Sequence, residues 1–363
     1  MKLAWVTALM GVAGLLSGCG ASSAETTSFG GSPRSSEATS SDGSGGGTSE
    51  TTPPASPDPG GATQGQSQGG LLTAGTWDDN RNFDVFKKFL GSMEGQTKRG
   101  ALNFSEAERT AARDKANAPR GPSQEADIAL VLDTTGSMGD ELSYLQTEFD
   151  AIAATLHEKV PQVTPRWSLV LYKDKGDTYL TRSFKFTSDT ATFRTQLRAQ
   201  AAGGGGDIPE AVVDGLGETE KLDWRKDASV AKMAFWVADA PAHPGQELQL
   251  TTAIRNVRDM GVHVYPVGAS GVSDTAEYQM RAAAQITGGR YLFLTDDSGV
   301  GNTHKEPRIP CYQVTKLDRA IVRMVKIEVT GQYSAPEPSE VLRSVGNPKD
   351  GRCETQGGPT ILY

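Results

Sequence analysis

An aspartate and two hydroxyl side chains stand at alternate positions directly after an apolar run. The run Ile128–Leu132 is followed by Asp133, Thr135 and Ser137. An uninterrupted apolar run predicts a strand buried on both faces of a sheet, and ligand sites of such sheets lie at the carboxyl ends of strands. One carboxylate and two hydroxyl oxygens suit a hard divalent cation, which keeps positions for water or for a partner's oxygen. The sequence therefore predicts an oxygen-ligand metal site at this strand end.

Two acidic segments follow at greater distance along the chain. Four glycines, Gly203–Gly206, lead into the sequence Asp-Ile-Pro-Glu at 207–210. A second apolar run, AKMAFWVA, ends immediately before Asp239. Both acidic segments fall where a loop meets regular structure, so we expect their carboxylates to lie at the same edge of the sheet as Asp133.

The D-x-T-x-S sequence at 133–137 resembles the metal-ion-dependent adhesion site of von Willebrand factor type A domains, whose motif is D-x-S-x-S. Thr135 departs from the motif but keeps the ligand oxygen. The D-x-P-E element and Asp239 look like those of the integrin β-subunit version of this domain. The resemblance implies five metal-site residues, Asp133, Thr135, Ser137, Glu210 and Asp239. It further implies that the bound ion is Mg²⁺, or Mn²⁺ or Ca²⁺ in its place, and that an Asp or Glu carboxylate of a protein ligand completes the coordination.

Three further acids have two interpretations each. The same resemblance places Asp140 and Glu141 at an adjacent metal site and Asp207 at a third. Asp140 and Glu141 also fall in the first turn of a predicted helix, where carboxylates favour the helix dipole without any metal. Asp207 can equally cap a helix in which Pro209 takes the first position. The sequence leaves both pairs of interpretations open.

The central part of the chain alternates between strand-like and helix-like segments. From Asp127 to about Thr295 apolar runs alternate with amphipathic stretches, and Arg319–Val329 predicts a closing helix. This alternation predicts an α/β fold, a doubly wound, mainly parallel central sheet with helices on both faces. The order of the segments is similar to that of a type A domain, which we place at residues 126–330.

The N-terminus has the order of an export signal. Lys2 precedes an apolar stretch that ends at Leu16-Ser17-Gly18-Cys19, which predicts a signal peptide over residues 1–18. The four residues resemble the bacterial lipobox, whose Cys becomes the lipidated first residue, and this implies a membrane lipid anchor on Cys19. A plain signal peptide with a chance Cys is the alternative. Gly20 is not the acidic inner-membrane retention signal of some lipoproteins, so the bacterial cell envelope is expected, with the outer membrane or cell surface favoured.

Two segments connect this N-terminus to the predicted domain. Residues 19–70 consist mostly of Gly, Ser, Thr, Pro, Gln and Ala, and such a segment cannot bury enough apolar surface to offset its ordering entropy, so a disordered tether is expected. Residues 71–125 predict a short helical extension. Trp77, Phe83 and Phe86 suggest one amphipathic helix, and Ser105 with Glu108 forms the capping box of a second.

Two of the three cysteines remain once Cys19 is assigned to lipid. Disulfides persist in exported compartments, so a bond between Cys311 and Cys353 is expected, which would pin the C-terminal tail at 331–363 to the domain. Two free thiols are the alternative.

Charge and motif content narrow the function. The formal net charge of −8, from 36 basic and 44 acidic residues, argues against a nucleic-acid partner. The four histidines are scattered, and no serine-hydrolase elbow, HExxH or phosphate loop is present. His243 either lines the metal site or makes a loop hydrogen bond. Asp133-Thr134-Thr135-Gly136 resembles an aspartic-protease D-T-G, but the required second D-T-G is missing.

These observations favour a non-enzymatic, metal-dependent, adhesion-type protein-binding module on a lipid-anchored tether. The alternative is an envelope scaffold or assembly lipoprotein in which the metal is only structural. An enzyme whose catalytic residues are not evident is a third, weaker interpretation.

Overall fold

The computed structural model of the chain describes residues 72–78, 80, 82, 83, 101–118, 120–299, 303–307, 309, 311–349, 352, 353, 361 and 362. The predicted signal peptide, the tether and Cys19 lie outside these residues. Within the described part, no helix is both long and apolar enough to cross a membrane.

A mixed sheet forms the centre of the described domain. It contains nine strands in the order β4-β3-β2-β5-β6-β7-β1-β8-β9. The neighbours β3, β2, β5, β6 and β7 run parallel, whereas β4 pairs antiparallel with β3, and β1 pairs antiparallel with both β7 and β8. The strands are β1 (Thr73–Trp77), β2 (Glu125–Asp133), β3 (Thr164–Tyr172), β4 (Thr181–Thr187), β5 (Ala231–Ala238), β6 (His263–Gly268), β7 (Tyr291–Thr295), β8 (Tyr312–Lys316) and β9 (Arg343–Val345).

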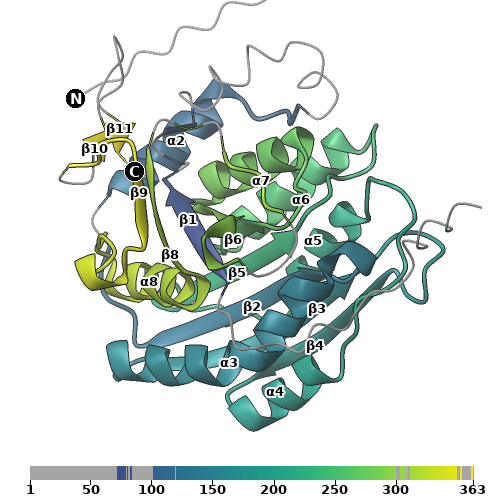
Figure 1. Cartoon of the computed structure of the whole chain (residues 1–363), viewed down its shortest axis with the longest axis horizontal. Coiled ribbons are helices and arrows are strands. Elements are labelled where there is room, and N and C mark those ends of the chain that lie inside the picture. The colour runs from purple at the N-terminus through teal and green to yellow at the C-terminus, as the bar shows by residue number, and fades with distance from the viewer. Residues whose placement is uncertain are drawn as a thin grey trace, which may run out of the picture. The chain divides into compact units, whose positions relative to one another are not determined.

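Helices cover both faces of this sheet (Figure 1). The apolar side chains of α3, α4 and α8 form one core cluster with one face, and those of α5, α6 and α7 form a second cluster with the other face. A doubly wound, mainly parallel sheet is therefore confirmed. The helices are α2 (Glu106–Asn117), α3 (Gly139–Lys159), α4 (Thr190–Arg198), α5 (Val212–Glu220), α6 (Glu247–Asp259), α7 (Asp274–Thr287) and α8 (Leu317–Thr330).

Strand β2 shows why the apolar run at 128–132 carries no alternation of polar and apolar residues. Ile128 and Leu130 belong to the core cluster under α3, whereas Ala129 and Val131 belong to the cluster under α5 and α6. Both sides of the strand are thus covered by helices, as expected for a parallel strand in the middle of a sheet.

The prediction for residues 71–125 is wrong in its first part. Trp77 was assigned to a helix, but Thr73–Trp77 forms β1 inside the main sheet, where Thr73 pairs with Thr295 of β7 and with Lys316 of β8. The sheet also includes β9 at Arg343–Val345. The domain therefore extends beyond the predicted 126–330 on both sides, because segments outside that range supply strands to its sheet.

Two local predictions agree with the structure. Helix α2 begins after Ser105, and the capping box between Ser105 and Glu108 is present. Cys311 and Cys353 form a disulfide, which ties the residue before β8 to the C-terminal tail. Phe86, Phe89 and Leu90, the remaining apolar positions of the predicted helix that contains Trp77 and Phe83, lie outside the described residues.

Candidate metal centre

Two neighbouring parallel strands bring the predicted carboxylates together. Strand β2 ends at Asp133, and β5, which pairs with β2 in parallel, ends one residue before Asp239. The third acid, Glu210, arrives from the loop before α5, where its backbone N–H donates to the carbonyl of Pro241 at 3.0 Å. Three segments distant in the sequence thus meet at one edge of the sheet.

The loop after β2 is organised around one carboxylate oxygen. Asp133 Oδ1 accepts hydrogen bonds from the Thr135 backbone N–H at 2.9 Å and from the Thr135 hydroxyl at 2.7 Å. The Thr135 and Ser137 hydroxyl oxygens lie 3.5 Å apart, and Ser137 also hydrogen-bonds to Asp239. The two hydroxyls therefore connect Asp133 to Asp239, which would otherwise face each other as like charges.

Two buried carboxylate oxygens of the predicted ligand residues, like Oε2 of Glu141 in the first turn of α3, have no hydrogen-bond partner among the described residues. They are Asp133 Oδ2 and Glu210 Oε2, on side chains that are 1% and 4% exposed. A buried charged oxygen without a partner is costly, and such an atom is commonly a ligand of an ion or a water molecule. The pair is therefore the feature of this edge that hydrogen bonding within the protein leaves unexplained.

The surroundings disfavour the charged form of these acids. Burial raises the pKa of Asp133 to about 7, although the hydrogen bonds from Thr135 oppose the rise. Burial, followed by repulsion from Asp133 and Asp174, raises the pKa of Glu210 to about 8. Burial likewise raises the pKa of Asp239. A bound cation would reverse this balance, since it stabilises all three carboxylates in their ionised forms.

An open pocket of about 230 Å³ lies over the site. Thr135, Ser137, Glu210 and Asp239 line it. Ser137 is exposed and Asp239 half-buried, whereas Thr135 and Glu210 lie buried below. The remaining wall consists of small or uncharged residues and of the loop that carries Asp207. These residues are Gly136, Gly204, Gly205, Gly206, Ile208, Ala240 and Gly271.

The glycine loop at 203–206 is fastened to the Asp133 loop by its backbone. The Gly203 N–H donates to the Thr134 carbonyl at 3.1 Å, and the Gly136 N–H donates to the Gly204 carbonyl at 3.1 Å. Gly204 has a φ of +80°, and a Cβ there would lie 2.2 Å from the Asp177 carboxylate. A side chain at this position would thus meet both backbone strain and a steric clash, which explains the glycine.

Sequence reasoning missed two charged residues that hold these loops. The Lys173 ammonium, on a residue only 3% exposed, donates to the carbonyls of Thr134 and Gly203. The two Asp177 carboxylate oxygens accept from the Gly205 N–H at 3.1 and 3.0 Å. Lys173 directly follows β3, the other parallel neighbour of β2, and Asp177 lies further along the same loop. The rule that placed Asp133 at a strand end could have identified them.

Of the three acids predicted for adjacent sites, Asp207 lines the pocket, whereas Asp140 and Glu141 do not. Asp140 and Glu141 occupy the first turn of α3, and neither lines the pocket. Glu141 is 2% exposed, and its Oε1 accepts from the backbone N–H and hydroxyl of Ser270 at 3.0 and 2.8 Å. Asp207 lines the pocket and is exposed. It does not cap a helix, because α5 begins after Ala211.

Two histidines lie near acidic partners. His243 Nε2 lies 2.6 Å from Asp174 Oδ1, so its ring contacts a carboxylate and not the backbone group expected for a loop histidine. His304 lies between Asp296, at 2.9 Å from Nδ1, and Ser270 Oγ, at 3.1 Å from Nε2. This order is that of a serine–histidine–aspartate triad. However, Ser270 is 7% exposed and its hydroxyl already donates to Glu141, so the arrangement links α3 to two loops.

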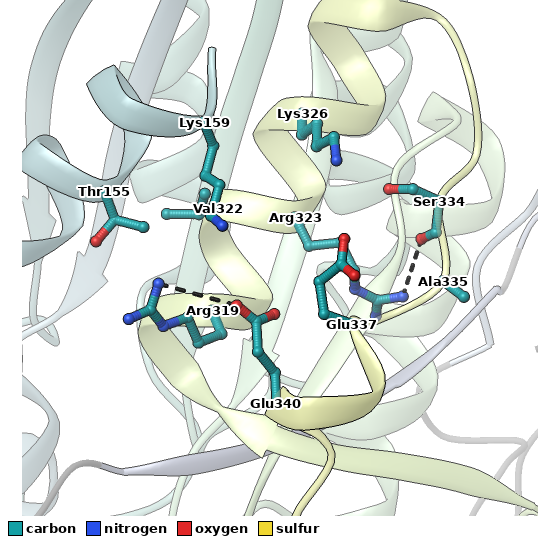
Figure 2. Close-up of a pocket in the computed structure, with 10 residues that line it drawn as sticks. All are labelled: Thr155, Lys159, Arg319, Val322, Arg323, Lys326, Ser334, Ala335, Glu337 and Glu340. Atoms are coloured by element: carbon teal, nitrogen blue, oxygen red, sulfur yellow. Dashed lines mark hydrogen bonds and ion pairs between the residues drawn. The ribbon is translucent and has the colours of Figure 1, made fainter. Parts of the chain in front are cut away.

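A second pocket, between α3 and α8, offers a contrast in charge (Figure 2). Its charged side chains include both signs, and two of its arginines have partners within the pocket. Arg319 lies 3.9 Å from Glu340, and Arg323 donates to the Ser334 carbonyl at 3.4 Å.

No three His, Cys, Asp or Glu side chains of the described residues converge as a metal site by themselves. A cation at Asp133 would therefore depend on the hydroxyls of Thr135 and Ser137.

Comparison with known proteins assigns the central part of the chain. Residues 127–299 match the family model described as the von Willebrand factor A domain. The chain therefore contains a domain of von Willebrand factor A type, and this domain carries the Asp133 loop, the glycine loop and Asp239.

Two curated relatives match part of the chain. One is a putative ariadne-like RING finger protein of Acanthamoeba polyphaga mimivirus, 29% identical over 191 residues, which are 46% of this chain and 18% of that protein. Another is an alpha-protein kinase of Dictyostelium discoideum, 27% identical over 119 residues, or 32% of this chain and 19% of that protein. The chain thus spans less than a fifth of the length of either relative.

Solved structures with similarity to the chain include two bacterial proteins. The conserved hypothetical protein BatB from Bacteroides thetaiotaomicron has a TM-score of 0.39 and 14% identity, covering 56% of this chain and 97% of that one. The pilus adhesin SpaC from Lactobacillus rhamnosus GG has a TM-score of 0.35 and 15% identity, covering 47% of this chain and 28% of that one.

Proposed function

We propose that this protein is a non-enzymatic binding module that holds a divalent cation at Asp133, Thr135 and Ser137, assisted by Glu210 and Asp239, and that binds a carboxylate of a partner protein there. A von Willebrand factor A domain fits a protein-interaction module. The observation that carries the metal dependence is the pair of buried, unpartnered oxygens, Asp133 Oδ2 and Glu210 Oε2.

The donor set supports a hard cation. Carboxylate and hydroxyl oxygens are ligands of Mg²⁺, Mn²⁺ and Ca²⁺, and the region offers no thiolate. When bound, such a cation supplies a position that accepts an oxygen of an Asp or Glu side chain. We place Mg²⁺ first, because a site with few protein ligands leaves coordination positions to water or to a partner, as Mg²⁺ sites commonly do.

The residues of the site have separate tasks in this proposal. Thr135 orients Asp133 through two hydrogen bonds to one oxygen and leaves the other oxygen without a partner. Ser137 connects this loop to Asp239. Glu210 adds negative charge from a different loop, so it tightens cation binding but lowers the attraction that remains for a partner carboxylate.

We further propose that the domain is attached to the bacterial cell envelope by a lipid on Cys19. The support is Leu16-Ser17-Gly18-Cys19, which closes an apolar segment, and the polar stretch 20–70 behind it. Cys19→Ala should leave the protein unprocessed or soluble. Mass spectrometry of the membrane fraction checks this, and an unmodified mature N-terminus at another residue would contradict the lipid anchor.

Calorimetric titration tests the metal site. Mg²⁺ and Mn²⁺ are titrated into chelator-stripped protein, comparing wild type, Glu210→Gln and Asp133→Ala. We expect measurable affinity in wild type, weaker affinity in Glu210→Gln, and none in Asp133→Ala. Equal affinity in wild type and Asp133→Ala would show that the Asp133 loop is only a turn.

A chelator distinguishes the proposal from a structural role of the metal. If the cation serves binding, removing it should abolish partner binding while the melting temperature barely changes. A large fall in melting temperature without loss of partner binding would instead identify an envelope scaffold in which the metal supports the fold.

A further inference from the structure

Ile208 is a large apolar side chain displayed in water at the edge of the candidate metal centre. It is 72% exposed, more than Leu248 at 63% and Leu342 at 52%, the next most exposed large hydrophobic side chains of the described residues. It also lines the same pocket as Thr135, Ser137 and Glu210. A single exposed aliphatic residue is ordinary on a protein surface, but one beside a concave polar site is typical of a binding position.

The loop that carries Ile208 is held in place before any partner arrives. The preceding glycines are fastened on two sides, to the Asp133 loop by the Gly203–Thr134 and Gly136–Gly204 hydrogen bonds and to Asp177 by the Gly205 N–H. After Ile208, the Glu210 N–H donates to the Pro241 carbonyl. A fixed side chain loses little conformational entropy when a partner covers it, which favours affinity.

Apart from Asp207, the pocket wall outside the predicted ligand residues is uncharged, and most of it is small. Gly204, Gly205, Gly271 and Ala240 line the pocket there, and they leave room for a side chain next to the carboxylate position. The pocket therefore combines oxygen atoms from the site residues with an apolar face at one side. A carboxylate alone would contact only the first of these two surfaces.

We infer that the partner segment presents an Asp or Glu directly beside an aliphatic or aromatic residue, and that this apolar residue packs on Ile208. The inference rests on the proposed function, since it takes the metal-bound carboxylate as given, and it specifies the chemistry next to it. Ile208 is then a specificity-determining residue. Glu210 and Asp133 decide whether a carboxylate binds, and Ile208 decides which carboxylates bind well.

Peptide selection tests the inference without knowledge of the natural partner. A library of random linear peptides is displayed on phage, bound to the immobilised full chain in Mg²⁺, and eluted with EDTA. Selected peptides should share an Asp or Glu with an aliphatic or aromatic neighbour. Selection on Ile208→Ser should retain the acid and lose the apolar neighbour. Ile208 is exposed, so this variant should fold normally, and circular dichroism and the melting temperature check that it does.

A selected peptide is then titrated by fluorescence anisotropy against three proteins. Relative to wild type, Ile208→Ser should weaken binding about 10-fold, the effect expected from leaving one aliphatic contact unburied. Leu342→Ser removes a comparably exposed aliphatic side chain that does not line this pocket, and it should change nothing. Replacing the peptide's apolar neighbour by Ser should weaken binding to wild type but not to Ile208→Ser.

The outcomes separate this inference from the proposed function. Acidic peptides without an apolar neighbour, or equal selection on wild type and Ile208→Ser, would overturn the role of Ile208 and leave the metal-dependent site standing. A selection that yields no EDTA-eluted acidic peptide would overturn both.

Discussion

Strand β2 has a buried aspartate near each end, and the two differ in the hydrogen-bond partners of their carboxylates. Asp127, near the start of the strand, accepts from the Arg166 guanidinium at 2.9 and 2.7 Å and from the backbone N–H of Arg225 at 2.8 Å. Asp133, at its end, has one oxygen bonded by Thr135 and one with no partner in the described residues. Both side chains are at most 1% exposed. Burial is therefore equal, and only the partners differ.

The same contrast recurs elsewhere on the sheet. Glu328 of α8 lies near the start of β6, where it accepts from Arg120 at 2.7 Å, lies 2.9 Å from the Nδ1 of His263, and hydrogen-bonds to the Tyr265 hydroxyl. Burial alone would raise the pKa of Glu328, but attraction to His263 and Arg120 outweighs it and holds the pKa well below the ordinary 4.5. At the other end, burial raises the pKa of Asp133 and of Glu210.

We interpret this difference as a division between acids that stabilise the fold and acids that are available to a ligand. Acids at the amino ends of the strands have their counter-charges supplied by the chain, so they contribute to the fold. At the carboxyl ends, Asp297 also pairs with an arginine, Arg343. Asp133 and Glu210, in contrast, each keep one oxygen without a hydrogen-bond partner among the described residues, and we propose that their charge is available to a ligand. The predictions below test this division.

The largest effects are expected from exchanging the two aspartates of β2 for alanine. Asp133→Ala should reduce Mg²⁺ affinity by more than about 100-fold, above the range typical of outer-shell changes, with little loss of stability because an unpaired buried carboxylate disappears. Asp127→Ala should do the reverse, costing about 3–5 kcal/mol of unfolding free energy by leaving Arg166 and Arg225 without their acid. Calorimetry and urea denaturation of both variants measure this. Similar stability losses in the two variants would contradict the division.

The disulfide should affect stability alone. Closing a loop with a sequence separation of 42 between Cys311 and Cys353 is worth about 3–4 kcal/mol in the chain-entropy model. Reduction should therefore lower the unfolding free energy by that amount without changing Mg²⁺ affinity. Thiol counting on the unfolded, unreduced protein is the control, and two reactive sulfhydryls would show that the bond is absent.

Glu328 should make stability depend on acid pH. Because its pKa in the folded protein lies below the ordinary 4.5, the unfolded chain binds the proton first as pH falls. The stabilisation is thus fully present above about pH 4.5 and is lost as pH falls toward the folded pKa. Glu328→Gln should cost about 3 kcal/mol at neutral pH and should flatten the pH dependence below 4.5. Urea denaturation at several pH values measures both, and an unchanged acid slope would contradict the assignment.

Much of this division could be predicted from the sequence. The apolar run at 128–132 predicted both the parallel strand and the position of Asp133 at its end, because such a run needs helices on both faces. The region of β1 was misassigned because Thr73–Trp77 is short and has no apolar alternation. Its strand structure comes from pairing with β7 and β8, and Gly75 permits close contact with Phe293, since a Cβ there would lie 2.3 Å from the ring.

The partners of the buried acids were harder to predict. Nothing in the local sequence distinguishes Asp127, which finds two arginines, from Asp133, which finds none, because the arginines lie 39 and 98 residues away along the chain. Asp177 is a similar case, since its contact with Gly205 spans 28 residues of sequence. Only the three-dimensional structure shows that these residues meet.

The smallest effect is expected for Asp177→Asn. The half-buried carboxylate of Asp177 accepts from the Gly205 N–H with both oxygens. This hydrogen bond is the largest cause of the lowered pKa of Asp177. Asparagine keeps the shape of the side chain but weakens its hydrogen bond to the glycine loop that positions Glu210. The substitution also removes one negative charge near the proposed cation. Both changes act in the same direction, so Mg²⁺ affinity should fall about 3- to 10-fold, or roughly 1 kcal/mol.

The matched control for Asp177→Asn is Asp189→Asn. Asp189 is an exposed aspartate that likewise accepts backbone N–H groups, from Ala191 and Thr192, but it caps α4 and does not line the pocket. Asparagine caps helices nearly as well as aspartate, so both stability and Mg²⁺ affinity should stay close to wild type. Amide hydrogen exchange at Gly205 should accelerate in Asp177→Asn alone. If both variants lowered Mg²⁺ affinity equally, the effect would reflect overall charge, and the glycine loop would not be a positioning element of the site.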